Sequence, residues 1–406
     1  MPFPASPATI GAQRRMEGLM IALARRHSVS AVSLVDSSTD ATAAGQAMRA
    51  YCRELVLVPT QWRSKLAVRL HQLRLLLARP SLERYLWTTP EMQRQLDRLL
   101  LVTSYDAVFV EFPFLAHYSV RHAQAGRPLP RVLVDEHNIE HDLSRRQAAV
   151  SHGVLRKLHY AVNWRKVRRE EIDAWNRADG VLFTSGEDLS RAIALCPSIR
   201  AKVVPNGVDL QYFRPRPEHR KPDGRSIVFF GTLDYFPNQD GMLHFLAVTW
   251  PLLQRTHPEA RLKVIGPRPT PEVLRHRGPR VEVTGMVEDL RPHLAEAAAI
   301  IVPLRVGGGT RLKILEAMAM GRPIVSTTVG AEGIVAVPGQ DILIADDPGT
   351  FASEVGRLLE SPELGARIGA SARSLVERRY SWGSVADELE RFLVELRDSP
   401  TPVRDL

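Results

Sequence analysis

Three consecutive glycines separate an apolar run from a stretch of helical periodicity: Gly307, Gly308 and Gly309. The run Ile300–Leu304 predicts a buried strand, and Thr310 precedes a helix that ends at Gly321. Backbone N–H groups and the positive end of the helix dipole converge at such a turn, and glycine lets a diphosphate approach closely. The pattern predicts a phosphate-binding loop, although a plain flexible turn fits it as well. It is not a Walker loop, because the GK[ST] ending is missing.

Two cations and a carboxylate follow these glycines. Arg311 and Lys313 add positive charge beside the loop. Glu316 follows Lys313 by three positions on the predicted helix, so the two side chains can pair. Alternatively, the Glu316 carboxylate can accept two hydrogen bonds from ribose hydroxyls. The residues alone leave both interpretations open.

Short β-branched runs alternate with helical stretches along the whole chain, which is typical of parallel α/β sheets. The strands expected in the first half are Val29–Val35, Glu54–Pro59, Ala107–Phe112, Arg131–His137, Gly180–Ser185 and Ala201–Pro205. Those expected in the second half are Ser226–Gly231, Arg261–Gly266, Val281–Thr284, Ile300–Leu304, Pro323–Thr328 and Ile342–Ala345. We therefore expect an α/β protein with two sheets.

The Pro- and Arg-rich stretch Tyr212–Arg225 opposes both periodicities and predicts a domain boundary. We expect an N-terminal domain over 1–205, a linker over 206–225 and a C-terminal domain over 226–380. Residues 381–406 form a last helix, which we expect to cross back to the first domain, and a tail. The N-terminal domain appears without its usual opening strand, since a Pro-rich loop leads directly into a helix at about Gly11. Either that strand is missing from this sequence or the sheet is built without it, which would expose apolar surface.

The composition is that of a globular protein and excludes disordered and fibrous classes. The chain has 406 residues, 44% hydrophobic and 24% charged, as an ordinary globular protein does. A net charge of +9 favours an anionic partner without identifying it. Two cysteines outside any metal-ligand spacing predict neither a disulfide framework nor a zinc site, and they suit a reducing cytoplasm. Without a long apolar run or a signal peptide, we expect a cytoplasmic protein, soluble or peripherally attached to the inner face of the plasma membrane.

The segment Trp62–Arg79 combines five basic residues with leucines and a tryptophan. Such a helix can lie on an anionic membrane surface. The same pattern suits a helix packed on the sheet with its basic residues in water, which we favour.

Several motifs resemble those of one enzyme family. These are LEAMA at 315–319, LFTSGEDLSRAI at 182–193, VVPNGVDLQYFRP at 203–215, FFGTLDYFPNQDGMLHF at 229–245, VEVTGMVEDLRPHL at 281–294 and RYSW at 379–382. Together they are similar to the retaining glycosyltransferases of family 4, also called glycosyl transferases group 1, in a subgroup with a GGGT-R-L-K loop. The resemblance covers nearly the whole chain. It implies a GT-B fold, in which two Rossmann-like domains with parallel sheets face each other across a cleft.

The resemblance also implies a reaction and its residues. The family transfers a sugar from a nucleotide-sugar donor to an acceptor with retention, and it needs no metal or other cofactor. Catalysis would involve His137, Arg311 and Lys313. Donor binding would involve Gly11, Gly231, Thr232, Gly285, Met286, Val287, Gly307, Gly308, Gly309, Thr310 and Glu316. Glu316 would bind the ribose, the glycine loop the diphosphate, and residues 285–287 the nucleobase.

Some positions depart from the family pattern or stay open. Gly308 stands where the family has the first of two glutamates, and Thr232 stands where many members have arginine. His137 follows a predicted strand in VDEHNIEHD, where a family histidine faces the sugar, but His141 competes for this role and either can be a packed side chain. On the helix that Gly11 opens, we expect the side chains of Arg14 and Arg15 to lie in water rather than bind the donor.

The expected partners are a nucleotide-sugar and a sugar or lipid-linked acceptor, in surface polysaccharide or glycolipid assembly. Reversible contact with an anionic membrane is the further partner we consider. Alternatives on the same fold are a nucleotide-sugar epimerase, a phosphorylase or a non-catalytic nucleotide-sugar binder. A nucleic-acid binder would explain the charge, but no recognition motif supports it.

Overall fold

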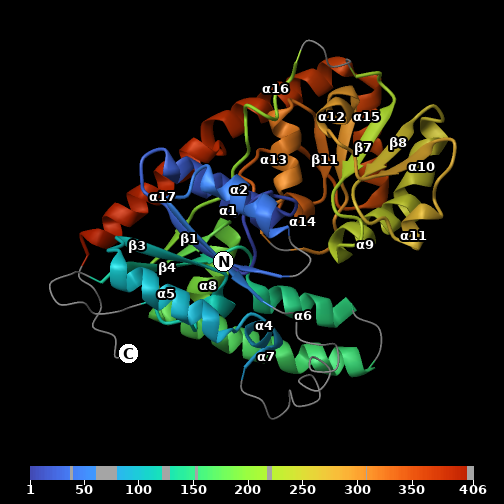
Figure 1. Cartoon of the computed structure of the whole chain (residues 1–406). Helices are drawn as coiled ribbons and strands as arrows, with labels where there is room; N and C mark the ends of the chain where they lie inside the picture. Colours follow the sequence, from blue (N-terminus) through green and yellow to red (C-terminus); the bar gives the residue numbers. More distant parts are fainter. Residues whose placement is uncertain are drawn as a thin grey trace. The chain divides into compact units, whose positions relative to one another are not determined.

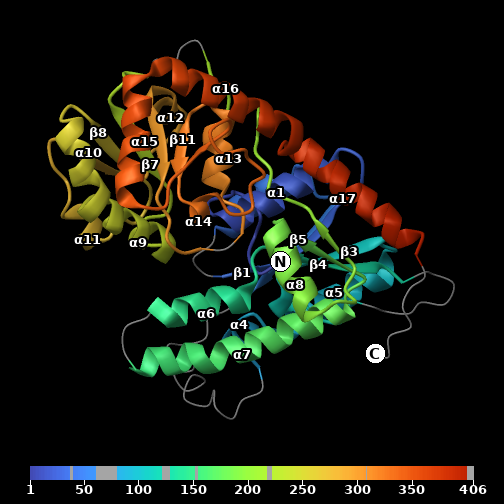
Figure 2. The same ribbon diagram turned by 180° about the vertical axis from the view of Figure 1, so that it is seen from behind.

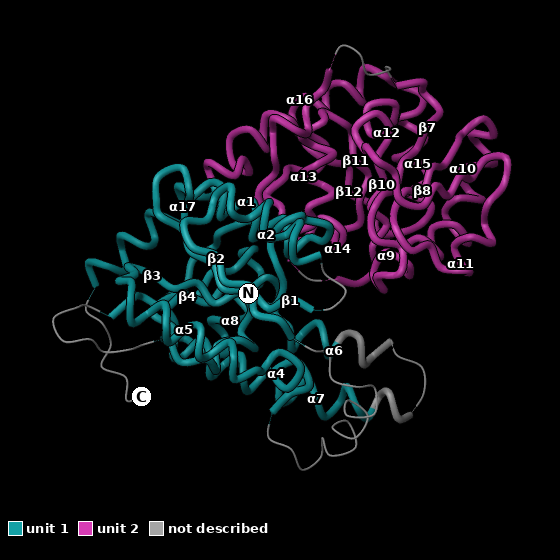
Figure 3. Tube along the Cα trace, viewed as in Figure 1, with its two compact units in different colours: residues 1–205, 385–406 teal, residues 206–384 magenta. Residues whose placement is uncertain are grey.

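The chain forms two compact units in a computed structural model that describes residues 1–36, 40–60, 80–120, 129–150, 154–216, 222–307 and 309–399. Unit 1 comprises Met1–Pro205 with Val385–Leu406, and unit 2 comprises Asn206–Ser384 (Figure 3). The stretch expected as a linker, 206–225, belongs to unit 2. The predicted helix over 62–79 lies outside the described residues.

Unit 1 contains two parallel sheets. Their strands are β1 (Ser30–Val35), β2 (Glu54–Pro59), β3 (Ala107–Glu111), β4 (Arg131–Glu136), β5 (Gly180–Phe183) and β6 (Ala201–Val203). In the described part of the unit, β1 pairs with β2, and the second sheet has the order β3-β4-β5-β6. Each strand overlaps the stretch expected from the sequence.

Helices cover both faces of these strands (Figures 1 and 2). They are α1 (Gly11–Ala24), α2 (Ala41–Arg49), α4 (Leu82–Leu86), α5 (Pro90–Val102), the 3-10 turn η1 (Pro113–Leu115), α6 (Glu140–Val150), α7 (Val154–Arg177), α8 (Gly186–Leu195) and the C-terminal α17 (Trp382–Arg397). Parallel strands buried on both faces are apolar throughout, which is why they appear in the sequence as continuous hydrophobic runs.

Helix α17 packs on unit 1 along most of its length. Arg26 of α1's C-terminal end pairs with Asp387 at 2.7 Å. At Gly180, where β5 begins, an added Cβ would lie 2.8 Å from a Leu396 methyl carbon. The absence of a side chain at this position therefore lets the helix approach the strand.

The described residues of unit 2 form one parallel sheet of six strands with the order β12-β11-β10-β7-β8-β9. The strands are β7 (Ser226–Phe230), β8 (Arg261–Ile265), β9 (Val281–Gly285), β10 (Ala299–Val302), β11 (Ile324–Ser326) and β12 (Leu343–Ile344). The helices are α9 (Phe236–His244), the π-helical turn η2 (Phe245–Thr249), α10 (Trp250–Thr256), α11 (Pro271–Leu274), α12 (Arg291–Glu296), α13 (Leu312–Ala319), α14 (Thr328–Ala331), α15 (Pro348–Glu360) and α16 (Pro362–Arg379).

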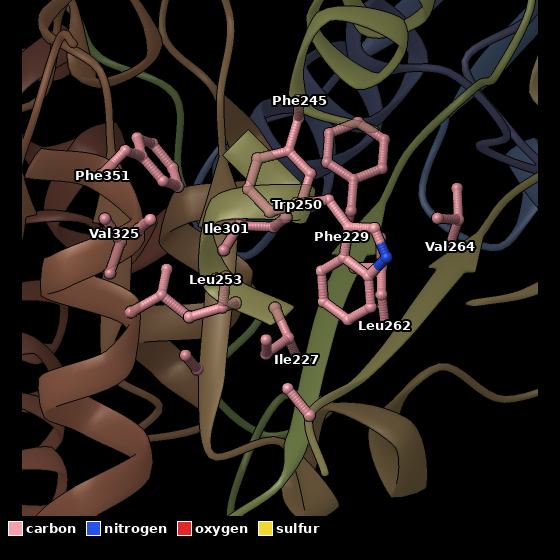
Figure 4. Close-up of a cluster of buried hydrophobic side chains, with 14 of the residues drawn as sticks. Ile227, Phe229, Phe245, Trp250, Leu253, Leu262, Val264, Ile301, Val325 and Phe351 are labelled. Atoms are coloured by element: carbon pink, nitrogen blue, oxygen red, sulfur yellow. The ribbon is translucent and has the colours of Figure 1, made fainter. Parts of the chain in front are cut away.

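Successive residues of β7 enter opposite cores of unit 2. Ile227 and Phe229 pack with Trp250 and Phe351 of the helices on one face (Figure 4). Val228 packs instead with side chains of α13 and α16 on the other face. The alternation follows from the two-residue period of a strand. Helix α13, which follows the glycine loop, is thereby fixed against the sheet by its buried face.

Candidate functional site

The glycine loop of unit 2 lies where the order of the strands reverses. In the sheet, β8 and then β9 follow on one side of β7, and β10 lies on its other side. The connections that leave β7 and β10 therefore diverge, and ligands of open α/β sheets bind at the carboxyl ends of the strands at such a point. Gly231 follows β7, and residues 303–311 connect β10 to α13.

The backbone is unusually close at this edge of the sheet. Gly231 N–H donates to the Ile265 carbonyl at 2.9 Å, and Gly266 N–H donates to the Gly285 carbonyl at 2.9 Å. Gly266 has φ +155°, and a Cβ there would lie 1.8 Å from the Gly231 carbonyl oxygen. At Gly231, with φ +147°, a Cβ would lie 2.8 Å from Lys313 Nζ. Glycines thus follow β7 and β8 and end β9, and they let these neighbouring segments approach each other closely.

The amine of the half-buried Lys313 lies beside Gly231. Its Nζ donates to Asn238 Oδ1 at 2.7 Å and lies 4.2 Å from the centre of the Phe229 ring. Burial, with a smaller contribution from the positive charge of Arg311, lowers the pKa of Lys313 to about 7. An ammonium group that is partly dehydrated in this way gains from a bound anion.

Asn238 orients this lysine, and the sequence analysis did not single it out. It lies in the first turn of α9, and its Nδ2 donates to the Thr232 carbonyl at 2.9 Å. The amide thus links the residue after Gly231 to the lysine of α13. Its segment, FPNQDG, was part of the resemblance, but only the contact across the sheet reveals its role.

Arg311 holds the glycine loop in place. Its Nη1 donates to the Gly309 carbonyl at 2.6 Å, and its Nη2 donates to the Val329 carbonyl at 3.4 Å. The Thr310 carbonyl accepts a long hydrogen bond of 3.4 Å from Asn206 Nδ2. Gly308 lies outside the described residues, while Gly307 and Gly309 flank it in the loop.

Of the other residues expected at the donor site, Glu316 and residues 285–287 belong to unit 2, and Gly11 belongs to unit 1. Glu316 is on α13, three residues beyond Lys313, and only 4% of its surface is exposed. Gly285 ends β9; Met286 after it is exposed, whereas Val287 packs on the core. Gly11 opens α1 in unit 1 and is exposed.

His137 follows β4 in unit 1 and is held by an acidic neighbour. Its Nε2 lies 2.8 Å from Glu111 Oε2 and 3.9 Å from Asp135 Oδ2. The ring stacks on Phe112 with a centroid separation of 4.1 Å and an interplanar angle of 8°. An ionised Glu111 carboxylate only accepts hydrogen bonds, so this contact requires a proton on Nε2.

The expectation that the side chain of Arg15 lies in water is wrong. Arg15 is 1% exposed, and its Nε and Nη2 donate to the Asp135 carboxylate at 2.8 and 2.6 Å. Its Nη1 donates to the Val204 carbonyl at 2.9 Å. The residue lies on the same buried face of α1 as Leu19, so a basic side chain there requires a buried counter-charge. Its neighbour Arg14 is half-buried.

Glu111, Asp135 and His137 also have the spacing of a metal site, since their ligand atoms lie within 4.8 Å of one another. Arg15 already supplies positive charge to Asp135. Arg15 thus balances one of the two carboxylates, Asp135, while His137 contacts the other, Glu111.

His141, the competing histidine, lies in the first turn of α6 and bonds through Nδ1 to Glu171 Oε2. The same carboxylate accepts the backbone N–H groups of Glu140 at 2.6 Å and His141 at 3.1 Å. Burial, then the charge of Glu171, raises the pKa of Glu140 to about 8. Glu171 thus caps the start of α6 and fixes the His141 ring.

No helix in the described ranges is both long enough and apolar enough to cross a membrane.

Comparison with protein-family models gives two matches that follow each other along the chain. Residues 10–212 match the model described as "Glycosyltransferase Family 4". Residues 224–361 match that described as "Glycosyl transferases group 1". The chain belongs to the family 4 glycosyltransferases. The resemblance drawn from the motifs is thereby confirmed.

Curated members of this family are similar over part of their length. The GDP-mannose-dependent alpha-(1-6)-phosphatidylinositol monomannoside mannosyltransferase of Mycolicibacterium smegmatis is 28% identical, over 55% of this chain and 64% of that protein. The D-inositol 3-phosphate glycosyltransferase of Corynebacterium efficiens is 27% identical, over 48% of this chain and 51% of that protein. The chain thus spans between half and two thirds of these relatives.

Solved structures agree with the family assignment at the level of the fold. Sucrose-phosphate synthase from Thermosynechococcus elongatus has a TM-score of 0.70 at 17% identity, over 97% of each chain. The Anabaena protein HepE, solved in complex with UDP, has a TM-score of 0.64 at 15% identity, over 96% of this chain and 98% of that one. The fold is therefore GT-B, as expected from the motifs.

Proposed function

We propose that this chain is a retaining glycosyltransferase that transfers a hexose from a nucleotide-sugar to a sugar or lipid-linked acceptor. The observation that carries the proposal is Lys313, a half-buried lysine held by Asn238 beside Gly231 at the strand reversal of unit 2. Transfer of the sugar leaves a nucleoside diphosphate whose negative charge grows in the transition state. Fixed donors aimed at that charge are the largest catalytic contribution in reactions of this kind.

The predicted residues with polar side chains and the base-contacting segment take these roles in the proposal. Lys313 binds the diphosphate directly, and Arg311 shapes the loop whose N–H groups approach it. Glu316 binds the ribose hydroxyls, and residues 285–287 contact the base. His137 acts on the sugar through Nδ1, with Glu111 fixing its tautomer. Since Lys313 and Arg311 supply positive charge, we infer that no metal ion is needed.

The relatives support an acceptor of the glycolipid kind. One acts, by its name, on a phosphatidylinositol mannoside and another on inositol 3-phosphate. The first uses GDP-mannose, whereas HepE was solved with UDP-glucose. We propose that the protein acts in glycolipid or surface polysaccharide assembly at the inner face of the membrane. Because the two proteins use different nucleotides, the experiment below tests donors with different bases.

The test is incubation with GDP-mannose, UDP-glucose or ADP-glucose and inositol-phosphate or lipid acceptors, followed by mass spectrometry of the products. We expect one donor to yield a glycosylated acceptor and a nucleoside diphosphate. Replacing Lys313→Met should lower the rate roughly 10²- to 10³-fold. The control Lys263→Met removes a lysine of β8 that is not part of the site and should retain the rate.

Other outcomes would favour the alternatives. Conversion of the donor into a second sugar nucleotide without an acceptor would indicate an epimerase. Donor binding without turnover of any acceptor would indicate a sensor. Binding of none of these donors would contradict the proposal altogether.

A further inference from the structure

The imidazole of His137 is contacted by two residues that follow each other in the chain, Glu111 and Phe112. Its Nε2 lies 2.8 Å from Glu111 Oε2. The ring of Phe112 lies nearly parallel to the imidazole, with 4.1 Å between the centroids and 8° between the planes. Successive residues of a β-strand point to opposite faces of the sheet. A regular continuation of β3 would therefore direct only one of these two side chains towards His137.

The backbone of Phe112 departs from the strand at this position, with φ +75° and ψ 137°. Pro113 disfavours a helical ψ in the residue before it, which agrees with this ψ but does not account for the positive φ. Bulky side chains rarely adopt a positive φ, because their Cβ then meets the backbone. Among the described residues, the only other non-glycine residue with a positive φ is the exposed Arg268. The departure from the strand explains how consecutive side chains reach one imidazole.

Other aromatic side chains hold the ring of Phe112 in place. Phe114 stacks on it with 5.1 Å between the centroids and 18° between the planes. Phe3 meets it edge to face at 6.0 Å, and Trp87 stacks on Phe114 at 6.3 Å. Aromatic pairs in these arrangements attract each other beyond the effect of the surface they bury. They keep Phe112, which is 7% exposed, in its strained conformation.

Glu111 and Phe112 restrict different motions of the imidazole. The hydrogen bond to Glu111 fixes the position of Nε2, but it leaves the ring able to rotate about the direction of that bond. The stacked ring of Phe112 fixes the plane of the imidazole. Only 4% of the His137 side chain is exposed, so these contacts rather than water surround it. Together the two residues determine the direction in which the second ring nitrogen faces.

We propose that Phe112 is a positioning residue for sugar transfer, whose strained backbone keeps its ring on His137 and holds the imidazole in one orientation before the donor binds. This inference rests on the role proposed for His137. A group that is already oriented avoids the cost of being ordered during the reaction. Backbone strain of this kind is concentrated at functional sites, where the surrounding structure maintains it.

A double-mutant cycle tests whether Phe112 acts through His137. Phe112→Leu keeps an apolar side chain but removes the aromatic face. We expect kcat to fall roughly 10- to 100-fold with KM nearly unchanged, as for a displaced catalytic group. In the His137→Ala background, which should itself lower kcat at least as much, the same substitution should have no further effect. Effects that multiply independently would overturn the inference.

Phe109→Leu is the matched control, because it makes the same change at a half-buried residue of the same strand. It should retain kcat. An equal loss of kcat in the two leucine variants would overturn the inference, since it would show a general effect of loosened packing in β3.

NMR of the full chain with labelled histidine, recorded without a donor, tests the positioning separately from the reaction. A fixed ring keeps the Nε2 proton bonded to Glu111. We therefore expect this proton to exchange with water at least about tenfold faster in Phe112→Leu than in the unchanged protein or in Phe109→Leu. Unchanged exchange in Phe112→Leu would overturn the positioning role.

Failure of the inference can be told apart from failure of the proposed function. If the unchanged protein transfers sugar from none of the donors, the proposed function fails, and the NMR measurement still decides whether Phe112 orients His137. An unchanged kcat in His137→Ala would overturn the role of His137 and this inference together.

Discussion

At the scale of single residues, the cations Lys313, which is half-buried, and Arg15, which is buried, differ in the group that accepts their hydrogen bonds. Lys313 has a neutral hydrogen-bond partner, Asn238, and a pKa lowered to about 7. Arg15 has a buried carboxylate, Asp135, that balances its charge. A cation with a neutral partner is poised to receive an anion, whereas a cation already paired serves the fold.

The titration of Lys313 predicts how donor binding depends on pH. A bound diphosphate favours the protonated lysine, so affinity is full below the pKa of the free protein, about 7, and falls as the pH rises above it. Calorimetry with GDP-mannose or UDP-glucose between about pH 6 and 9 should show a fall that approaches tenfold per pH unit above 7. In Lys313→Met, binding should be roughly 10- to 100-fold weaker and independent of pH. Equal pH slopes in the two proteins would contradict this assignment.

The Arg15 pair predicts a large effect on the stability of unit 1. Arg15→Met leaves the Asp135 carboxylate buried without a counter-charge, which should cost about 3–5 kcal/mol of the free energy of unfolding. The matched control is Arg14→Met on the same helix, which should cost much less. Urea denaturation measures both, and similar losses in the two variants would refute the buried-pair interpretation.

At the scale of elements, the closeness of β7, β8 and α13 decides what fits at the carboxyl edge of the unit 2 sheet. Hydrophobic runs predicted every strand of this sheet, because the burial of a parallel strand is a property of consecutive residues. They could not predict that Gly231 lies beside the amine of Lys313, since this contact joins segments far apart in the chain.

Gly231→Ala should therefore impair the site itself. The new Cβ would come within 2.8 Å of Lys313 Nζ in a backbone conformation that side chains rarely adopt. We expect a loss of about 1–3 kcal/mol in stability and a clear loss of donor affinity. Gly278→Ala in the same unit is the control, because nothing lies within 4 Å of its added Cβ. Thermal unfolding and calorimetry would contradict the prediction if both variants behaved alike.

At the scale of the whole molecule, two units with separate cores should respond differently to the donor. A ligand that binds the folded state at 100 times its Kd stabilises it by about 2.7 kcal/mol. Since most of the expected donor residues lie in unit 2, hydrogen exchange should slow more in β7 and β10 than in β4 and β5. Equal protection of both units would argue against a donor site centred on unit 2.

The sequence by itself determined the positions of the strands, the glycine loop and the family, because hydrophobic periodicity and motifs are local along the chain. Only the tertiary structure decided which charges are compensated. Arg15 and Asp135 are 120 residues apart, and Lys313 and Asn238 are 75 apart. From the sequence we therefore expected the side chain of Arg15 to lie in water, and we assigned no role to Asn238. The physical reason is that the free energy of a buried charge depends on the groups that the fold brings within a few ångströms of it, which neighbours in sequence do not reveal.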